Sequence, residues 1–264
     1  MSIRKLLLAL VGLALIATAV LLWLKPGEQP AEQPGNTTAT NEATPATPAG
    51  ARALPEAEQL ALAFKTAYGA TKSATIETKD AKLTAEPGEL LWVGDIAVLL
   101  SPTKSEADCH ACAGTLAITY LKAKGDGFEV TGKWPDLIVG AGWGEAPDWK
   151  VTDAFTTLPA VYEEGSYMGQ GVSCSNATIT ELKPGGPVQS ELIWLSSSNG
   201  GAIDEETGKT FGGEPAKELE GKITDIVKGK SFTVKATGTA SFTESYIYRD
   251  GKFVPTQPDS KLTC

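Results

Sequence analysis

Two thiols and an imidazole lie together in the segment Asp108-Cys109-His110-Ala111-Cys112. Covalent haem attachment is excluded, because it needs a histidine directly after the second cysteine and position 113 is Ala113. Thiol–disulfide exchange fits the Cys-x-x-Cys spacing, and an imidazole beside the first thiol would lower the pKa of that thiol. A metal site is a third possibility, since Cys109, His110 and Cys112, together with Cys174, are ligand types that zinc accepts.

Both the exchange site and the metal site meet an obstacle. An exchange motif normally opens a helix in an α/β fold, whereas this segment precedes a predicted strand. A zinc site is usually built from two pairs of ligands, each pair close together in the sequence, and the chain has no second such pair. His110 is also the one histidine of the chain. We therefore predict a structural disulfide in a loop that exposes His110. Redox or metal-binding use of Cys109-His110-Ala111-Cys112 is the alternative prediction.

The complete set of thiols is Cys109, Cys112, Cys174 and Cys264. An even number of cysteines in an oxidising compartment favours two disulfides, and four cysteines allow three pairings. The sequence alone does not choose among the pairings. Our prediction is a local Cys109–Cys112 bridge and a Cys174–Cys264 bridge that ties the C-terminus to a sheet.

Other patterns that resemble catalytic or nucleotide-binding motifs lack a required residue. A phosphate loop ending in Gly208-Lys209-Thr210 would need a glycine at position 203, which is Ile203. The two carboxylates of Glu163 and Glu164 would point to opposite faces of a strand, so at most one of them could serve in a site. We expect no catalytic constellation, no cofactor and no metal, and hence a protein that is not an enzyme.

Tryptophan side chains are the other candidates for binding, because exposed rings stack on sugars or dock protein partners. Burial in the core is the simpler expectation for most of them. Trp143 lies between two glycines and is the one that we predict to be exposed. The predicted binding surface is the segment of residues 140–149, with Trp143, Trp149 and His110 as its candidate residues.

The chain also resembles a known group of proteins. The segment from Asp108 to Gly114, Lys133-Trp134 and Gly142-Trp143-Gly144 are similar to segments of uncharacterised bacterial envelope proteins that carry Cys-His-Ala-Cys before a strand. The resemblance covers about residues 90–200. It implies a location in the bacterial envelope and no particular activity.

The elements that position these residues are mostly strands. A helix is predicted from Pro55 until Gly69 ends it, with apolar residues at helical spacing between them. Residues 96–100 predict a buried strand closed by Pro102. Glycine-rich turns then separate paired strands, the strongest being Asp250-Gly251, since Asp-Gly readily adopts the positive φ of a type I′ turn. The predicted strand pairs are 115–122 with 128–134, 178–183 with 188–195, 232–236 with 240–242, and 246–249 with 252–254.

Short connections of this kind exclude βαβ crossovers, which need a dozen or more residues. The predicted fold is mainly β: an antiparallel, hairpin-built sandwich with one N-terminal helix. Residues 118–122 (ITYLK) and 179–183 (ITELK) are similar, and each is followed by a glycine turn and a tryptophan. These two units could form the two sheets of a sandwich or two blades of a partial propeller, although unrelated hairpins share the same preferences. We predict the sandwich, because two copies are too few for a closed propeller.

The N-terminus predicts a membrane address. Residues 1–5 form a basic cytoplasmic region, and residues 6–24 are free of charge and about 28 Å long as a helix, close to the thickness of the hydrocarbon core. We expect an uncleaved signal anchor in the inner membrane, with cleavage after Ala19 as the alternative. Residues 25–54 predict a flexible Pro/Thr/Ala linker, and residues 55–264 a periplasmic β-domain.

Charge narrows the possible partners. The 264 residues include 32 acidic and 23 basic side chains and carry a formal net charge of −9, which argues against binding of nucleic acid. The expected partners are the inner membrane, through the N-terminal helix, and an envelope protein or glycan. The sequence thus predicts a membrane-anchored periplasmic β-domain that is a non-catalytic binding or interaction module of the bacterial envelope.

Overall fold

A computed structural model of the chain describes residues 50–107, 109, 111–140, 142–204, 206–210 and 213–264. The predicted anchor, most of the predicted linker and His110 lie outside the described residues. Within these residues, no helix combines the length and the apolar character that a membrane span requires.

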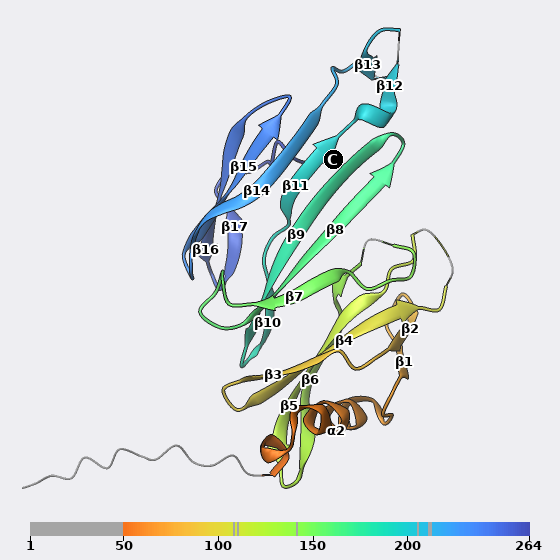
Figure 1. Cartoon of the computed structure of the whole chain (residues 1–264), viewed down its shortest axis with the longest axis vertical. Helices are drawn as coiled ribbons and strands as arrows, with labels where there is room; N and C mark the ends of the chain where they lie inside the picture. The colour runs from red at the N-terminus through yellow and green to blue at the C-terminus, as the bar shows by residue number, and fades with distance from the viewer. Residues whose placement is uncertain (1–49, 108, 110, 141, 205, 211–212) are drawn as a thin grey trace, which may run out of the picture. The chain divides into compact units, whose positions relative to one another are not determined.

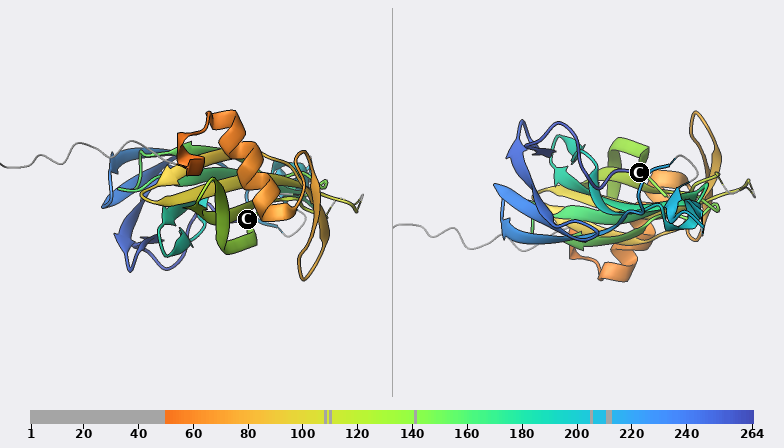
Figure 2. Two further views of the ribbon diagram at one scale, coloured as in Figure 1. Left: turned by 90° about the horizontal axis from the view of Figure 1, so that it is seen from below. Right: turned by 90° about the horizontal axis from the view of Figure 1, so that it is seen from above.

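The first sheet has six antiparallel strands in the order β1-β2-β4-β5-β6, with β3 paired to β4. The only α-helix of the described residues, α2 (Glu56–Tyr68), lies across this sheet, as the view from below shows (Figures 1 and 2). The strands are β1 (Ala74–Glu77), β2 (Lys82–Ala85), β3 (Glu89–Val93), β4 (Ile96–Ser105), β5 (Thr115–Lys124) and β6 (Gly127–Val139).

The second sheet has nine strands in the order β17-β16-β15-β14-β11-β9-β8-β7, with β10 paired to β9. All recorded pairings are antiparallel, so the expected mainly-β, antiparallel class with one α-helix is confirmed. The strands are β7 (Asp148–Thr152), β8 (Ala160–Gly169), β9 (Val172–Lys183), β10 (Gly186–Gln189), β11 (Ile193–Ser198), β14 (Glu218–Val227), β15 (Ser231–Gly238), β16 (Phe242–Arg249) and β17 (Lys252–Pro255).

Smaller elements complete the fold. A two-stranded sheet pairs β12 (Ile203–Asp204) with β13 (Lys209–Thr210), and η2 (Gly200–Ala202) is a short 3-10 turn. The packed domain also begins earlier than predicted. η1 (Gly50–Ala53) falls in the stretch assigned to the linker, yet Ala51 is completely buried, and Arg52 stacks on Trp92 at 4.4 Å. The boundary at residue 55 is therefore wrong, because a small alanine rather than a large apolar residue anchors this turn.

Turn chemistry explains where several elements end. Gly69 ends α2 in the left-handed conformation at a φ of 77°, and its N–H donates to the carbonyl of Lys65, as a C-terminal glycine cap does. Asp250 and Gly251 have φ values of 52° and 86° between β16 and β17, which confirms the predicted type I′ hairpin. The glycine-rich turn at residues 125–127 joins β5 to β6 as predicted.

Two strand boundaries differ from the prediction. β4 continues through Pro102 to Ser105, because β3 pairs with β4 only up to Leu100 and β2 pairs with it only from Thr103. Pro102 thus lies in the gap between the β3 pairing and the β2 pairing. No backbone hydrogen bond from position 102 is needed on that side of β4, so a proline is tolerated there. The predicted strand at residues 188–195 is split into β10 and β11, with Ser190 and its neighbours between them.

Three hydrophobic clusters form the core. The first lies within the second sheet, where Phe232 of β15 contacts Phe253 of β17 at 5.1 Å between ring centroids. Phe155 stacks on Tyr162 of β8 at 5.7 Å and meets Phe232 edge to face at 5.6 Å. This sheet is therefore curled around its own core, because strands near both of its ends share one cluster. The third cluster lies between α2 and the first sheet.

The second cluster joins the two sheets. It combines Ile118 and Ile138 of the first sheet with Val161 and Leu182 of the second, all of them fully buried. Ile118 and Leu182 belong to the two similar ITYLK and ITELK units, which therefore lie in different sheets and meet in this cluster. A pocket at the edge of this junction, described below, has walls from both sheets.

Candidate functional site

The Cys-His-Ala-Cys segment lies in the connection from β4 to β5. Cys109 and Cys112 are joined in a disulfide, and the N–H of Cys112 donates to the carbonyl of Cys109 at 3.1 Å, so the bridge closes a single tight turn. The second predicted bridge, Cys174–Cys264, is also present and ties β9 to the C-terminus. Both predicted pairings are confirmed.

Trp143 is the most prominent side chain near this turn. It is 69% exposed, whereas Gly142 and Gly144 on either side of it are buried. The three residues have φ values of 133°, 58° and 76°, a backbone conformation that residues other than glycine rarely adopt. A bulky residue in the left-handed region costs roughly 1–2 kcal/mol, and such positions cluster at functional sites. The predicted exposure of Trp143 is confirmed.

Hydrogen bonds hold the Trp143 loop, residues 142–145, against the disulfide turn. The N–H of Gly144 donates to the carbonyl of Cys112 at 2.7 Å, and the N–H of Ser105 donates to the carbonyl of Gly144 at 2.8 Å. The N–H of Gly114 donates to the carbonyl of Glu145 at 3.0 Å, and the Glu145 carboxylate pairs with Lys104. The exposed indole is therefore presented by a loop that is fixed at Gly144 and Glu145, directly after the ring.

A hollow of about 670 Å³ lies beside the disulfide turn. Its walls are the turn from β1 to β2, the residues on both sides of the bridge, and the end of β6. Acidic and basic side chains both line the hollow, and its volume falls within the range of small-molecule sites. The lining includes Asp80, Lys82, Glu106, Cys112, Asp136 and Val139.

The other two predicted binding residues are Trp149 and His110. Among the described residues, no contact between Trp149 and the Trp143 loop is recorded. Trp149 lies on β7, is half-buried, packs against the cluster between the sheets, and lines a small surface pocket with Tyr162 and Glu164. Its role in binding stays a prediction. The alternation of side chains along β7 turns this ring toward the core. His110 lies outside the described residues. Among the residues that are described, no group of three or more His, Cys, Asp or Glu side chains is placed to hold a metal.

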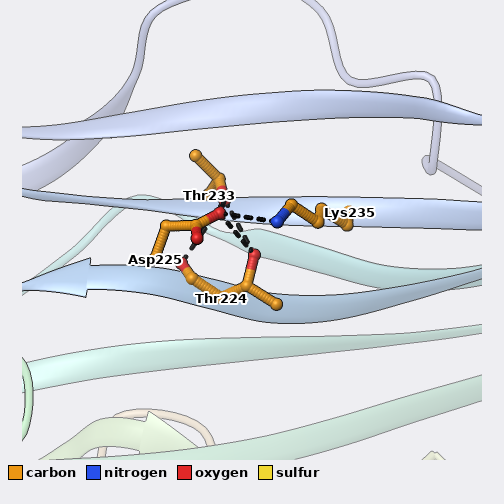
Figure 3. A network of polar contacts seen from close by, with 4 residues as sticks. All are labelled: Thr224, Asp225, Thr233 and Lys235. Atoms are coloured by element: carbon orange, nitrogen blue, oxygen red, sulfur yellow. Dashed lines mark hydrogen bonds and ion pairs between the residues drawn. The ribbon is translucent and has the colours of Figure 1, made fainter.

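A polar network on the second sheet has a structural role. Asp225 occupies a bulge in β14 at a φ of 52°, and its Oδ2 accepts hydrogen bonds from Thr224 at 3.0 Å and Thr233 at 2.8 Å (Figure 3). Lys235 pairs with the same oxygen at 2.9 Å. The lysine, followed by the two hydroxyls, lowers the pKa of Asp225 to about 2. These contacts join β14 to β15, and no spacing in the sequence indicates them.

Two buried carboxylates of the second sheet also hold strands and the chain end in place. Glu181 on β9 accepts from the hydroxyl of Tyr248 on β16 and pairs with Lys183 at 3.4 Å. Glu244 on β16 accepts from Ser260 Oγ at 2.8 Å and from the N–H of Lys261 at 2.7 Å. Both oxygens of Glu244 and the Oε2 of Glu181 are thus used within the fold.

No family model, curated protein or solved structure matches this chain. The functional interpretation therefore depends on the geometry of the Trp143 loop and of the hollow beside the disulfide turn. An exposed aromatic ring on a fixed loop, next to a concave surface of mixed charge, is suited to recognition of a partner.

Proposed function

We propose that the chain is a membrane-anchored periplasmic β-domain that serves as a non-catalytic binding or interaction module of the bacterial envelope. Residues 6–24 are the proposed inner-membrane anchor, and the linker that follows gives the domain reach above the membrane. In this proposal the two sheets form a sandwich across their shared cluster, and the Trp143 loop is the binding element.

The observation that carries the proposal is the exposure of Trp143 on a strained and hydrogen-bonded loop. The left-handed backbone disfavours the folded state, and the exposed ring contributes little burial to offset that cost, so a role in recognition accounts for their occurrence at one residue. Fixing the ring in advance also lowers the entropy lost when a partner binds. The partner classes that suit it are a protein surface or a glycan, since both dock on exposed aromatic rings.

Crosslinking of the full-length protein in its membrane tests the proposal. A photoreactive residue placed beside the loop, at Glu145, should capture a defined protein or glycan partner. Trp143→Ala should weaken the isolated complex by about 2 kcal/mol or more, the usual effect of removing a central aromatic anchor. Met168→Ala is the matched control, because Met168 is 73% exposed and lies on β8. Equal affinity of all three proteins would refute the proposal.

A redox function is the second candidate, favoured by the exposure of Cys109 at one end of the bridge and by the place of Cys112 in the hollow. An exposed disulfide is accessible to attack by a partner's thiolate. Thiol titration and metal analysis of the purified protein distinguish the candidates. Free thiols that appear on incubation with a reduced thiol–disulfide oxidoreductase would favour redox exchange, and bound zinc would favour a metal site. A fully oxidised, metal-free and unreactive protein would favour the binding module.

A further inference from the structure

A second pocket, of about 280 Å³, lies between the end of β6 and the strands β8, β9 and β10. Leu137 and Val139 of the first sheet form one side, and Glu163 and Thr178 of the second sheet lie on the other. The volume is slightly below that of sites for drug-sized ligands, so it suits a single side chain or a small molecule. This pocket is distinct from the hollow beside the disulfide turn.

Glu163 is unusual among the residues of this pocket. Its side chain points toward the first sheet, opposite to that of Glu164, and the residue is only 5% exposed. Thr178 Oγ1 donates to Glu163 Oε1 at 2.6 Å, and Gln189 Nε2 donates to Thr178 Oγ1 at 3.1 Å. This chain of hydrogen bonds fixes the carboxylate. No donor to Glu163 Oε2 is recorded among the described residues.

The surroundings of the carboxylate define the chemistry that would complement it. Glu163 is the only ionisable side chain among the described residues that line the pocket. Asn176 and Ser166 offer neutral oxygens, while Val139 and Leu192, which are 54% and 41% exposed, form an apolar rim. A buried carboxylate is costly unless a cation or further donors satisfy it.

We propose that this pocket binds an organic cation, a primary ammonium or guanidinium group on an aliphatic stem. The charged head would donate to Glu163 Oε2 and to the neighbouring amide or hydroxyl oxygen, and the methylene groups of the stem would pack against the apolar rim, as in buried lysine and arginine side chains. Calcium is a poorer match, because it needs six to eight oxygens and one carboxylate supplies few of them.

Two further features keep the pocket open to such a ligand. Gly165 lines it, and a Cβ atom at this position would lie 3.2 Å from Asn176 Oδ1, so any larger residue would narrow the space. The pairing of β7 with β8 ends at Asp148 and Glu164, which leaves the edge of β8 beside the pocket without β7 as its partner. An extended segment of another protein could therefore bring a lysine or arginine side chain to Glu163.

Titration of the full-length protein in detergent micelles, followed by NMR or calorimetry, tests the proposal. The probes are n-butylammonium and a short peptide with a single lysine, and n-butanol is the uncharged counterpart. We expect both cations to bind and n-butanol not to bind. Glu163→Gln should weaken binding about tenfold or more, the loss expected for a charge-assisted hydrogen bond. Glu164→Gln, which removes the same charge from the other face, should leave the affinity unchanged.

The two probes also distinguish the sources of the cation. Tighter binding of the peptide would assign the pocket to a protein partner, and equal binding would assign it to free amines; both results support the proposal. Gly165→Val provides a second test, because it fills the pocket and retains the carboxylate, and it should abolish binding in a protein whose circular dichroism is unchanged. Unaltered affinity in Glu163→Gln and Gly165→Val, or an equal loss in Glu164→Gln, would overturn the proposal.

Discussion

Trp143 and Glu163 occupy positions that disfavour the folded state for different reasons. Trp143 exposes an aromatic ring from a left-handed backbone, and Glu163 keeps a carboxylate between two sheets. Glycine suits a left-handed position better than tryptophan does, and a neutral side chain suits a buried position better than a carboxylate does. Asp225 differs from Glu163, because its Oδ2 accepts from Thr224 and Thr233 and pairs with Lys235.

The ionisation of Glu163 predicts a pH dependence of stability. Burial, which is the largest effect, and the nearby Glu164 raise the pKa of Glu163, whereas the hydrogen bond from Thr178 lowers it. The folded protein therefore retains this proton at pH values where the unfolded chain has lost it, so stability decreases as the pH rises from the ordinary glutamate pKa through the raised one. Glu163→Gln lacks this loss and should gain stability relative to the wild type as the pH rises.

Urea unfolding at pH 4 and pH 8 measures the effect. The free energy of unfolding of Glu163→Gln, relative to that of the wild type, should be higher at pH 8 than at pH 4. Glu164→Gln is the control, and it should keep most of the wild-type pH dependence because burial of Glu163 is unchanged. A difference that shrinks toward pH 8 would show that the carboxylate is better stabilised in the folded state than its surroundings indicate.

At the scale of elements, the Trp143 loop depends on the close approach of three chain segments at Gly114. A Cβ atom at this position would collide with the carbonyl oxygen of Thr103 and would lie 2.7 Å from the backbone of Glu145 and Ala146. Gly114→Ala should therefore push the Trp143 loop away from β4 and cost about 1–3 kcal/mol, as overpacking in a well-packed region does.

Chemical denaturation, with the NMR signal of the Trp143 indole as a local probe, checks this prediction. Gly185→Ala is the matched control, because nothing lies within 4 Å of a Cβ atom there. That variant should stay within about 0.5 kcal/mol of the wild type. A shift of the Trp143 signal in Gly114→Ala but not in Gly185→Ala would confirm that the loop is held through Gly114.

Local chemistry explains which elements were predictable. The Asp250-Gly251 turn, the cap at Gly69, the paired strands around residues 125–127 and the exposure of Trp143 all depend on neighbouring residues, and the structure confirms them. Both disulfides were also predicted, although the sequence left three pairings open.

Features that depend on distant segments were not predictable. The passage of β4 through Pro102 depends on where β2 and β3 end, and the burial of Ala51 depends on the strands that it meets. Trp149 turns toward the core because the first sheet lies opposite. The pocket at Glu163 is formed by both sheets, and the sequence indicated only that Glu163 and Glu164 face opposite ways.

At the scale of the whole molecule, the C-terminus completes the core of the second sheet. Leu262 is fully buried in the first cluster, and Ser197 Oγ donates to the carbonyl of Thr263 at 2.8 Å. The Cys174–Cys264 disulfide closes a span of 90 residues, whereas Cys109–Cys112 spans three. The long bridge encloses β10, β11 and β14 to β17, so it restricts most of the second sheet in the unfolded chain.

The two bridges should therefore differ in their effects on global stability. In the chain-entropy model, a bridge over such a long loop stabilises by about 4–5 kcal/mol and one over a very short loop by about 2 kcal/mol. The double variant Cys174→Ser/Cys264→Ser should lower the unfolding temperature by roughly 10 °C or more, since each kcal/mol corresponds to about 2–4 °C for a domain of this size. Cys109→Ser/Cys112→Ser should lower it less and should mainly affect the Trp143 loop. Calorimetry of both variants under the same conditions measures the two decreases in unfolding temperature. Equal decreases would mean that Leu262 and the hydrogen bonds of the C-terminus hold the chain end without help from the Cys174–Cys264 bridge.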